Sequence, residues 1–296
     1  MSGAAVRHNA TRLTVVEPGL RSLVQDSGRH GWAHLGVGRS GAADRPAMAL
    51  ANRLVGNKQD AAVVEVTNGG LELSFDAPTW VAVTGAPLPI RVGTRARWTH
   101  ESIRVGAGET VRLAIPQLGL RSYLAVRGGL LGDSVLGSRS TDLMSGLGPA
   151  PLGAGDVLPV GAPHGPVPVA DVVAPWMPAA PDQDVVLPVQ FGPRDDWFEH
   201  EAVDLLLGER FEVTAESDRI GARLAGPALP RRIQDELVSE GMVEGSLQAP
   251  PGGRLTLFGP DHPVTGGYPV IAVVPSRALP PVAQLRPGQG VRFRRD

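Results

Sequence analysis

Glycine and proline interrupt this chain so often that long regular elements have little room to form. Its 296 residues include 38 glycines and 28 prolines, and only 4% are aromatic. Because both residues favour turns, this composition predicts many short strands joined by tight turns. The predicted strands, mostly β-branched or alternating and bounded by Gly, Pro or Asp, are Leu13–Val16, Ala62–Val66, Leu71–Phe75, Trp80–Thr84, Thr110–Ile115, Ser122–Val126, Val185–Val189, Phe211–Thr214, Arg254–Phe258, Pro269–Val274 and Gly290–Phe293.

Only two stretches are predicted to be helical. Asp44–Val55 starts with an N-cap aspartate, has Pro46 in its first turn and is followed by Gly56. Asp195–Leu207 repeats that plan, with acidic residues at its start and Gly208 after it. The expected fold class is therefore mainly β, with two short helices.

The chain is long enough for one large core or two medium ones, and we expect two. A Pro/Ala-rich stretch, Pro163–Pro181, has few charges and no sustained periodicity, which is typical of a linker. We predict an N-terminal domain over residues 1–165, a linker over 166–184 and a C-terminal domain over 185–296.

A faint internal repeat supports two related domains. S-I-x-V-x-x-G from Ser102 matches S-L-x-A-x-x-G from Ser246, and L-x-x-P from Leu113 matches L-x-x-P from Leu257 at the same offset. Tyr123 and Tyr268 follow one residue out of step. The simplest interpretation is two related β-domains, each with one helix.

Residues that the chain lacks exclude several functional classes. It has no cysteine and a single lysine, Lys58, which excludes disulfide scaffolds, thiolate catalysis, cysteine-ligated metals and Schiff-base chemistry elsewhere in the chain. The net charge of −2 comes with scattered arginines, so no nucleic-acid or membrane partner is expected. No apolar run approaches the roughly 20 residues that span a bilayer, and no signal-peptide core is found, so we expect a cytoplasmic protein.

The segment Val24–Asn57 carries more polar residues than a fold alone requires. An amide, a carboxylate and a guanidinium fall in one turn at Gln25, Asp26 and Arg29; together they can grip a small polar ligand and place a general base beside it. The alternative for Asp26 is an Asx-turn. For Asp44 it is a helix N-cap, which does not exclude a second role.

Two motifs within this segment are interpreted as coincidental. Gly36–Gly41 satisfies G-x-G-x-x-G, but it lacks the preceding buried strand and the later βαβ units of a dinucleotide site. His30 and His34 have no helix around them and no third ligand, so no metal site is expected. A Walker loop is also absent from the sequence, so any ATP is not held in such a cradle.

Three clusters in the C-terminal half combine carboxylates or arginines with glycines: Ser217–Gly226, Ser239–Gln248 and Asp261–Pro269. Taken singly, each is explained by a β-turn with surface salt bridges. Their shared chemistry favours a pocket for a small anionic or amide-bearing molecule.

The chain resembles the family that comprises KipA, the C-type subunit of 5-oxoprolinase and the second subunit of allophanate hydrolase, also described as a biotin-dependent carboxyltransferase domain. The matching motifs follow in order along nearly the whole chain: V-Q-D-x-G-R at Val24–Arg29, L-G-x-x-x-S-G-x-x-D at Leu35–Asp44, A-N-x-L-V-G-N at Ala51–Asn57, Glu65, Y-L-A-V-x-G-G at Tyr123–Gly129, L-G-S-R-S-T-D at Leu136–Asp142, Gly192-Pro193, Ser217-Asp218-Arg219, Ser239-Glu240-Gly241, T-G-G-Y-P at Thr265–Pro269 and A-Q-L-x-P-G at Ala283–Gly288. Two departures are Ile220 in place of methionine and His262-Pro263 in place of Arg-Gln. The second precedes the T-G-G-Y-P turn, where a change bears on substrate identity if that loop touches the substrate.

The resemblance implies two cyclophilin-like β-barrel domains, each with one short helix. It implies two partners, a KipI-like subunit and a third, LamB/YcsF-like subunit. Together with this chain they would open 5-oxoproline to L-glutamate and consume ATP. The ATP site within the complex is not assigned to this chain. Catalytic roles are expected for Asp26, Arg29, Asp44, Asp218 and Arg219. Substrate contacts are expected for Gln25, Ser40, Gly41, Asn52, Glu65, Glu240, Gln248, Asp261, Thr265, Gly267 and Tyr268.

Two other functions remain open from the sequence. One is a carboxyltransferase that acts on urea or a related amide, with biotin on a separate carrier because Lys58 does not resemble an attachment site. The other is a non-enzymatic antagonist of a KipI-like kinase inhibitor. The dense polar loops favour a small-molecule pocket over a plain protein-binding surface, and we expect the chain to be inactive alone.

Overall fold

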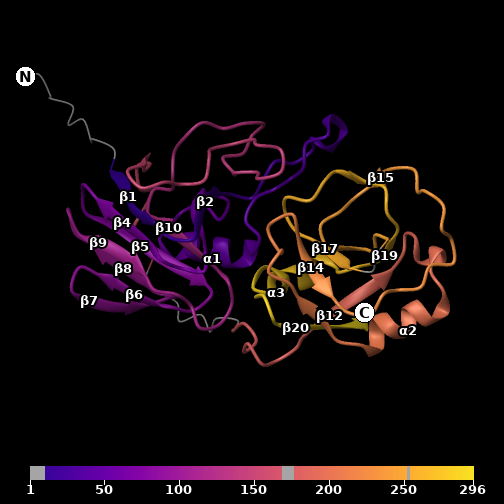
Figure 1. Ribbon diagram of the computed structural model, residues 1–296. Helices are drawn as coiled ribbons and strands as arrows, with labels where there is room; N and C mark the ends of the chain where they lie inside the picture. The colour runs from indigo at the N-terminus through magenta and orange to yellow at the C-terminus, as the bar shows by residue number, and fades with distance from the viewer. Residues whose placement is uncertain (1–10, 169–176, 252–253) are drawn as a thin grey trace, which may run out of the picture.

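The structure is a computed structural model that describes residues 11–168, 177–251 and 254–296. It is mostly β, as predicted, with three short α-helices among the described residues. Figure 1 shows the N-terminal half, in indigo and magenta, beside a C-terminal half in orange and yellow. No helix in the described ranges is long and apolar enough to cross a membrane.

Two sheets pack face to face in the N-terminal half. The first has the order β11-β1-β4-β9-β6-β7 and the second β2-β3-β10-β5-β8. Alternate residues of both sheets, such as Leu73, Phe75, Val81 and Val83, are fully or almost fully buried in one apolar core. The strands are β1 (Arg12–Pro18), β2 (Arg21–Gln25), β3 (Val63–Thr67), β4 (Leu71–Phe75), β5 (Thr79–Gly85), β6 (Pro89–Val92), β7 (Arg95–Trp98), β8 (Ser102–Val105), β9 (Thr110–Leu113), β10 (Arg121–Val126) and β11 (Val157–Pro159).

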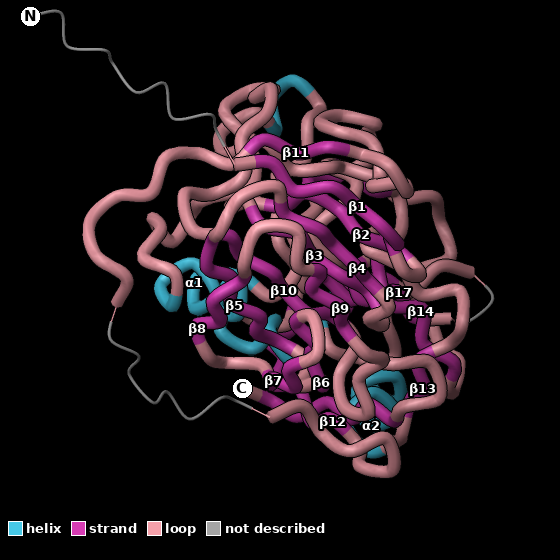
Figure 2. Tube along the Cα trace, turned by 90° about the vertical axis from the view of Figure 1, so that its left-hand side faces the viewer, coloured by secondary structure: helices cyan, strands magenta, loops and turns pink. Residues whose placement is uncertain are grey.

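Helix α1 (Arg45–Leu54) covers the outer face of the second sheet, beside β5 and β10 (Figure 2). Asp44 caps it by accepting a hydrogen bond from the Ala47 amide at 3.0 Å, as predicted. Its apolar face packs on Tyr123 and other residues of the sheet. Strand β10 is therefore covered on both faces, which explains why all six of its residues are buried, Arg121 and Ser122 included.

The C-terminal half is a closed barrel in the order β12-β19-β16-β17-β14-β13-β20, in which β12 and β20 pair in parallel. A two-stranded ribbon, β15 with β18, stands apart from it. The bounds are β12 (Val185–Phe191), α2 (His200–Gly208), β13 (Phe211–Val213), β14 (Gly221–Ala225), β15 (Glu240–Gly241), β16 (Ser246–Gln248), β17 (Leu255–Phe258), β18 (Thr265–Gly266), β19 (Val270–Val273), α3 (Leu279–Ala283) and β20 (Gly290–Arg295); short 3-10 helices lie at Ala33–Leu35, Asp195–Trp197 and Ser276–Ala278.

Three details differ from the sequence-based expectations. Asp195–Leu207 is not one helix, because a 3-10 turn ends at Trp197 and α2 begins at His200 with no side-chain cap. A further helix, α3, starts at a Pro-Pro step that is compatible with a first helical turn. In the described N-terminal half the strands hydrogen-bond as two separate sheets, whereas the C-terminal strands close into one ring.

The repeat segments are strands in both halves, β8 and β9 in one and β16 and β17 in the other. Their partners differ: β8 pairs with β5, whereas β16 pairs with β17 and β19. The predicted domain limits and the linker stay predictions, and residues 169–176 of that linker lie outside the described residues.

Candidate functional site

The long loop between β2 and α1 folds back on itself and extends toward the C-terminal half (Figure 1). Its two arms are joined by hydrogen bonds from the Arg29 amide to the Arg39 carbonyl, at 2.7 Å, and from the Ala42 amide to the Asp26 carbonyl, at 2.9 Å. Gly28, with φ +89°, permits this closure, because a Cβ there would lie 2.5 Å from the Arg39 carbonyl oxygen.

Asp26 ties this loop to residues 138–140. Its carboxylate accepts hydrogen bonds from the Gly28 amide at 2.8 Å, the Arg139 amide at 2.6 Å and the hydroxyls of Ser138 and Ser140 at 2.6 Å each. The Asx-turn foreseen for Asp26 is thus present, and the two oxygens are occupied by four donors. These contacts make Asp26 a residue that positions the loop; its catalytic role stays a prediction.

The same pair of loops holds two more of the predicted residues. The Gln25 amide donates to the Thr141 carbonyl at 2.8 Å. Ser40 is completely buried, and its hydroxyl lies 2.7 Å from an Asp261 carboxylate oxygen. Because Asp261 belongs to the C-terminal half, this contact joins the two halves of the molecule.

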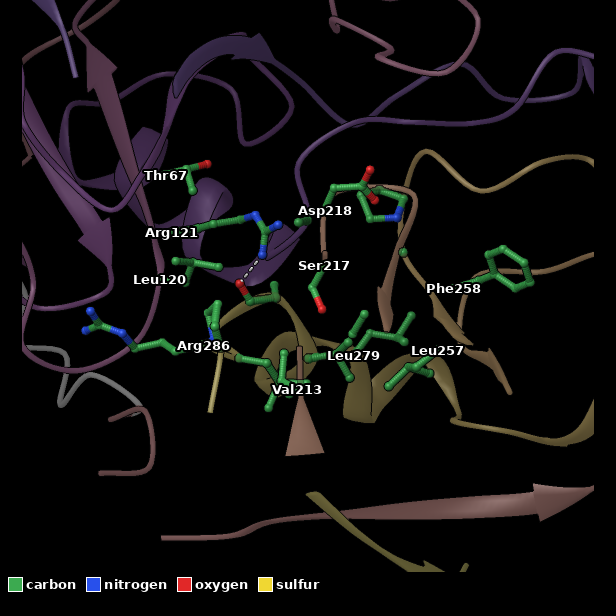
Figure 3. A pocket seen from close by; sticks show the side chains of 18 of the residues that line it. Thr67, Leu120, Arg121, Val213, Ser217, Asp218, Leu257, Phe258, Leu279 and Arg286 are labelled. Atoms are coloured by element: carbon green, nitrogen blue, oxygen red, sulfur yellow. Dashed lines mark hydrogen bonds between the residues drawn. The ribbon is translucent and has the colours of Figure 1, made fainter. Parts of the chain in front are cut away.

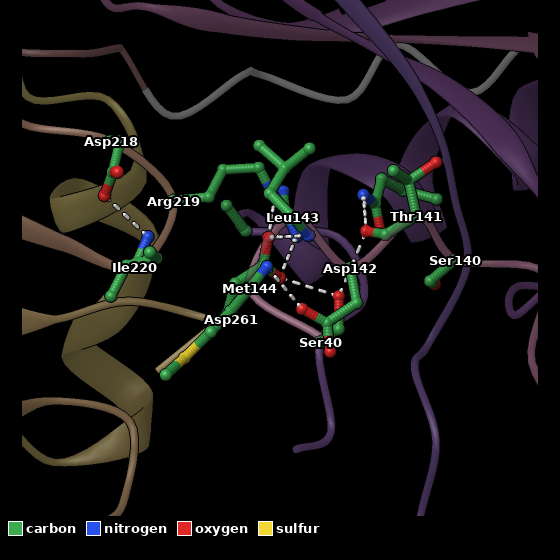
Figure 4. Close-up of polar contacts among 12 residues, drawn as sticks. Ser40, Ser140, Thr141, Asp142, Leu143, Met144, Asp218, Arg219, Ile220 and Asp261 are labelled. Carbon is green, nitrogen blue, oxygen red and sulfur yellow. Dashed lines mark hydrogen bonds and ion pairs between the residues drawn. The ribbon is translucent and has the colours of Figure 1, made fainter. Parts of the chain in front are cut away.

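Arg219 is the centre of that junction. Its guanidinium forms two hydrogen bonds with Asp261, at 2.8 and 2.9 Å, and others with Glu65 of β3 and the Gly41 carbonyl. The side chains of Arg219, Glu65 and Asp261 are each at most 1% exposed. Figure 4 shows Arg219 and Asp261 beside the Ser140–Met144 segment, where the Leu143 amide donates to Asp261.

The electrostatics of this junction are balanced. Burial alone would lower the pKa of Arg219, but the carboxylates of Glu65 and Asp261 raise it above the ordinary arginine value. Arg219 therefore stays charged, and its charge is paired and hydrogen-bonded, as a buried ion requires.

A second junction lies at Asp44. Gln284 donates to its carboxylate at 3.0 Å and accepts hydrogen bonds from the amides of Leu120 and Arg121. Burial raises the pKa of Asp44, while the bonds from Gln284 and from the Ala47 amide oppose that shift.

Two cavities flank these junctions. The first, of about 280 Å³, is mainly apolar, with Leu257, Phe258 and Leu279 on the barrel side. Figure 3 shows Arg121 and Asp218 at its polar edge. The Arg121 guanidinium donates to the Ala283 carbonyl at 2.6 Å, which binds the N-terminal half to α3.

The second cavity, of about 370 Å³, is cationic. Arg29, Arg39 and Arg45 line it from the N-terminal half, and Glu244 is the one carboxylate among its described lining residues. Arg45 pairs with Glu244 at 2.8 Å across the gap. Burial lowers the pKa of Arg39, and the charge of Arg45 lowers it further. Glu244 and Leu279 line both cavities, so the two are neighbours.

Other predicted residues lie elsewhere. Asn52 is buried inside α1, where it donates to the Ala61 carbonyl at 2.8 Å and accepts from Asn57; these contacts hold the turn after the helix, and Asn52 lines neither cavity. Of the predicted site residues, Arg29 and Asp218 are the ones that line these two cavities. The last five surround the β15–β18 ribbon, away from both: Glu240, Gln248, Thr265, Gly267 and Tyr268. Glu240 is ion-paired with Arg194 there.

Five residues at these junctions and cavities were not predicted from the sequence as site residues: Arg39, Arg45, Arg121, Glu244 and Gln284. The sequence feature that could have indicated the cationic cavity is the clustering of Arg29, Arg39 and Arg45 in one glycine-rich segment. No group of three or more potential metal ligands is found in the part of the chain that the structure describes.

Comparison with known proteins gives a consistent result. The family model described as carboxyltransferase domain, subdomain A and B, matches residues 35–295. The C-type subunit of the 5-oxoprolinase of Escherichia coli (strain K12) is 36% identical over 284 residues, covering 95% of this chain and 90% of that protein.

Two larger proteins are similar to this chain over part of their length. The urea amidolyase of Lachancea kluyveri is 31% identical over 307 residues, covering 94% of this chain and 16% of that protein. A crystal structure of the protein TTHA0988 superimposes with a TM-score of 0.85 at 35% identity, covering 97% of this chain and 56% of that chain.

Proposed function

The chain belongs to the family of the carboxyltransferase domain, subdomains A and B, and we propose that it is a subunit of a 5-oxoprolinase. The observation that carries this proposal is the similarity to the C-type subunit of 5-oxoprolinase, which extends over 90% of that protein. The cavities between the two halves supply the kind of site that a small lactam requires.

The proposed reaction opens 5-oxoproline to L-glutamate at the expense of ATP. A lactam resists hydrolysis, so phosphoryl transfer to the carbonyl oxygen makes the carbonyl carbon susceptible to water before the ring C–N bond breaks. This chain would bind and orient the lactam. Asp218 and Glu244 are carboxylates that line the cavities, and one of them would accept a proton from the attacking water.

The complex would include a KipI-like subunit and a third, LamB/YcsF-like subunit, and this chain would be inactive alone. A nucleotide site on this chain is not part of the proposal, because the sequence has no Walker loop. The name of the Escherichia coli relative, which describes one subunit of several, supports an assembly of this kind.

The test is ATP-dependent release of glutamate from 5-oxoproline by the assembled complex, with each subunit omitted in turn. We expect release to stop when this chain or ATP is left out. A correctly assembled complex that releases no glutamate would overturn the proposal.

A second candidate function is transfer of a carboxyl group to urea or a related amide. It is favoured by the 31% identity to a urea amidolyase over 94% of this chain. Biotin would have to arrive on a separate carrier, since Lys58 is the single lysine. Carboxylation of urea by this chain with a carboxybiotin-bearing carrier, without glutamate release from 5-oxoproline, would favour this alternative.

A further inference from the structure

Arg29 is a buried cation without a counter-ion among the described residues. Its side chain is 1% exposed, and one nitrogen, Nη2, donates to the Ser140 carbonyl. Nε and Nη1 are buried and have no hydrogen-bond partner in the described part of the chain. Arg219, equally buried, pairs with two carboxylates, so the contrast between the two arginines is direct. A buried charge left unpaired is costly, which makes such a group beside a cavity a candidate for binding an anion.

The loops hold Arg29 in place. Its backbone amide is bonded to the Arg39 carbonyl at 2.7 Å. On the other side lies Gly148, with φ +84°, where an added Cβ would come within 2.8 Å of Nη2 of Arg29. The same Cβ would lie 2.0 Å from the Ser140 carbonyl oxygen that accepts the Arg29 hydrogen bond, so a larger residue there would disturb both partners. The site is thus built before a ligand arrives, and a rigid donor loses little entropy on binding.

The cavity beside Arg29 adds further positive charge. Arg39 and Arg45 line it with Arg29, against the carboxylate of Glu244. Nε of Arg45 is also buried and without a partner among the described residues. Burial lowers the pKa of Arg29, and the more distant charges of Asp142, Asp26 and Asp261 only partly oppose this. Arg29 and Arg45 therefore carry unused donors just behind the cavity wall, and the described lining has more cations than anions.

We propose that this cationic cavity binds the carboxylate of the lactam substrate, with Arg29 as its main donor. Arginine suits the task because its planar fork matches the two oxygens of a carboxylate. The adjoining apolar cavity, which shares Glu244 and Leu279 with this one, would take the ring. This inference rests on the proposed function, because it assigns the anion to 5-oxoproline.

The test compares ligands with and without the carboxylate on the assembled complex. 5-Oxoproline, 2-pyrrolidinone (the same ring without the carboxylate) and inorganic phosphate are titrated by calorimetry. We expect 5-oxoproline to bind at least about tenfold more tightly than 2-pyrrolidinone, the value of one lost charged hydrogen bond. Equal affinities for the two lactams would overturn the inference, as would binding of phosphate with no binding of 5-oxoproline.

Arg29→Met tests the donor. It should remove the preference for 5-oxoproline over 2-pyrrolidinone, and Arg29→Lys should retain part of it. Arg254→Met, at an exposed arginine paired with Glu216, is the matched control and should leave both affinities unchanged. If Arg29→Met does not assemble, Arg39→Met should weaken 5-oxoproline binding severalfold. Wild-type affinity in the folded Arg29 or Arg39 variants would overturn the inference.

The outcomes also separate this inference from the proposed function. Binding of 5-oxoproline that depends on Arg29, without any glutamate release, would overturn the function and support the anion site. Glutamate release with an unchanged Michaelis constant in Arg29→Met would support the function and overturn the anion site.

Discussion

Arg219 and Asp261 form a bidentate ion pair, with Nε–Oδ2 and Nη2–Oδ1 distances of 2.8 and 2.9 Å. Their side chains are 1% and 0% exposed. Glu65, from the N-terminal half, contacts the same guanidinium. The pair therefore couples the barrel to the two-sheet half, and its removal would leave two buried carboxylates without their cation.

Arg219→Met should lower the free energy of unfolding by about 3–5 kcal/mol, the usual cost of leaving a buried charge unpaired. Urea denaturation of the purified chain measures this. The control is Arg254→Met, because the Arg254–Glu216 pair is about two-thirds exposed and such surface pairs contribute about 0–1 kcal/mol. Equal losses in the two variants would mean that the interior pair does not hold the halves together.

Asp26→Asn tests whether Asp26 positions the loop or acts on substrate. Asparagine replaces one of the two acceptor oxygens of Asp26 with an NH2 donor. At least one of the four groups that now donate to Asp26, the Arg139 amide among them, would lose its acceptor. We therefore expect the free energy of unfolding to fall by about 1–3 kcal/mol. Asp156→Asn is the control, since one oxygen of Asp156 accepts a hydrogen bond from the Gly153 amide and asparagine retains that oxygen. Lost turnover with unchanged stability in Asp26→Asn would favour the catalytic role.

Gln284→Leu should destabilise the chain in a pH-dependent way. The hydrogen bond from Gln284 lowers the pKa of Asp44, whereas burial raises it; the variant therefore raises that pKa further. A carboxyl whose folded pKa exceeds its unfolded value of 3.8 loses stability as pH rises between the two values.

The loss caused by Gln284→Leu should thus be smallest near pH 4 and grow toward pH 7, by more than about 1 kcal/mol. Urea denaturation at several pH values measures it. Gln190→Leu, at an exposed position with one long hydrogen bond to Asp296, should show no such slope. A loss independent of pH would mean that Gln284 acts only through its bonds to the Leu120 and Arg121 amides.

The local features of this molecule were predictable from sequence, and the contacts between its halves were not. The Asp44 cap depends on a residue three positions away, and the predicted strands on alternation within a few residues. The bond from Arg219 to Glu65 spans 154 positions and that from Gln284 to Asp44 spans 240. No local sequence pattern predicts these two hydrogen bonds, because they form only when the two halves pack against each other.

Several strands were not predicted because polar residues interrupt their apolar pattern. Strand β2 was missed because Ser22 and Gln25 interrupt its apolar pattern, although both are completely buried. Strands β6 and β8 each carry one exposed arginine, and β7 carries two half-buried ones. Each strand has four residues, which is too short for a distinct alternation. The residues around the β15–β18 ribbon were assigned to the site from their chemistry alone, which does not show where the chain folds them.

His30 provides the last prediction, which concerns how anion binding depends on pH. It lies at the exposed rim of the cationic cavity, where burial and the charges of Arg39 and Arg45 lower its pKa below 6.5. A hydrogen bond with the Ser27 backbone and the charge of Asp26 oppose that shift. The other charged or titratable residues lining the cavity are Arg29, Glu244 and His262.

A bound carboxylate would offset the arginines and raise the pKa of His30, so binding would take up a proton. Affinity for 5-oxoproline should therefore increase severalfold as pH falls from about 7.5 to 5.5, the range in which histidine titrates. The stability of the free protein should change in the opposite direction. Because the pKa of His30 is lowered in the folded state, the free energy of unfolding falls as pH drops below 6.5. NMR titration of the His30 ring with and without ligand measures the shift. His30→Asn should remove the pH dependence and His200→Asn, at the start of α2, should not; a His30 pKa that stays constant or falls on binding would contradict the prediction.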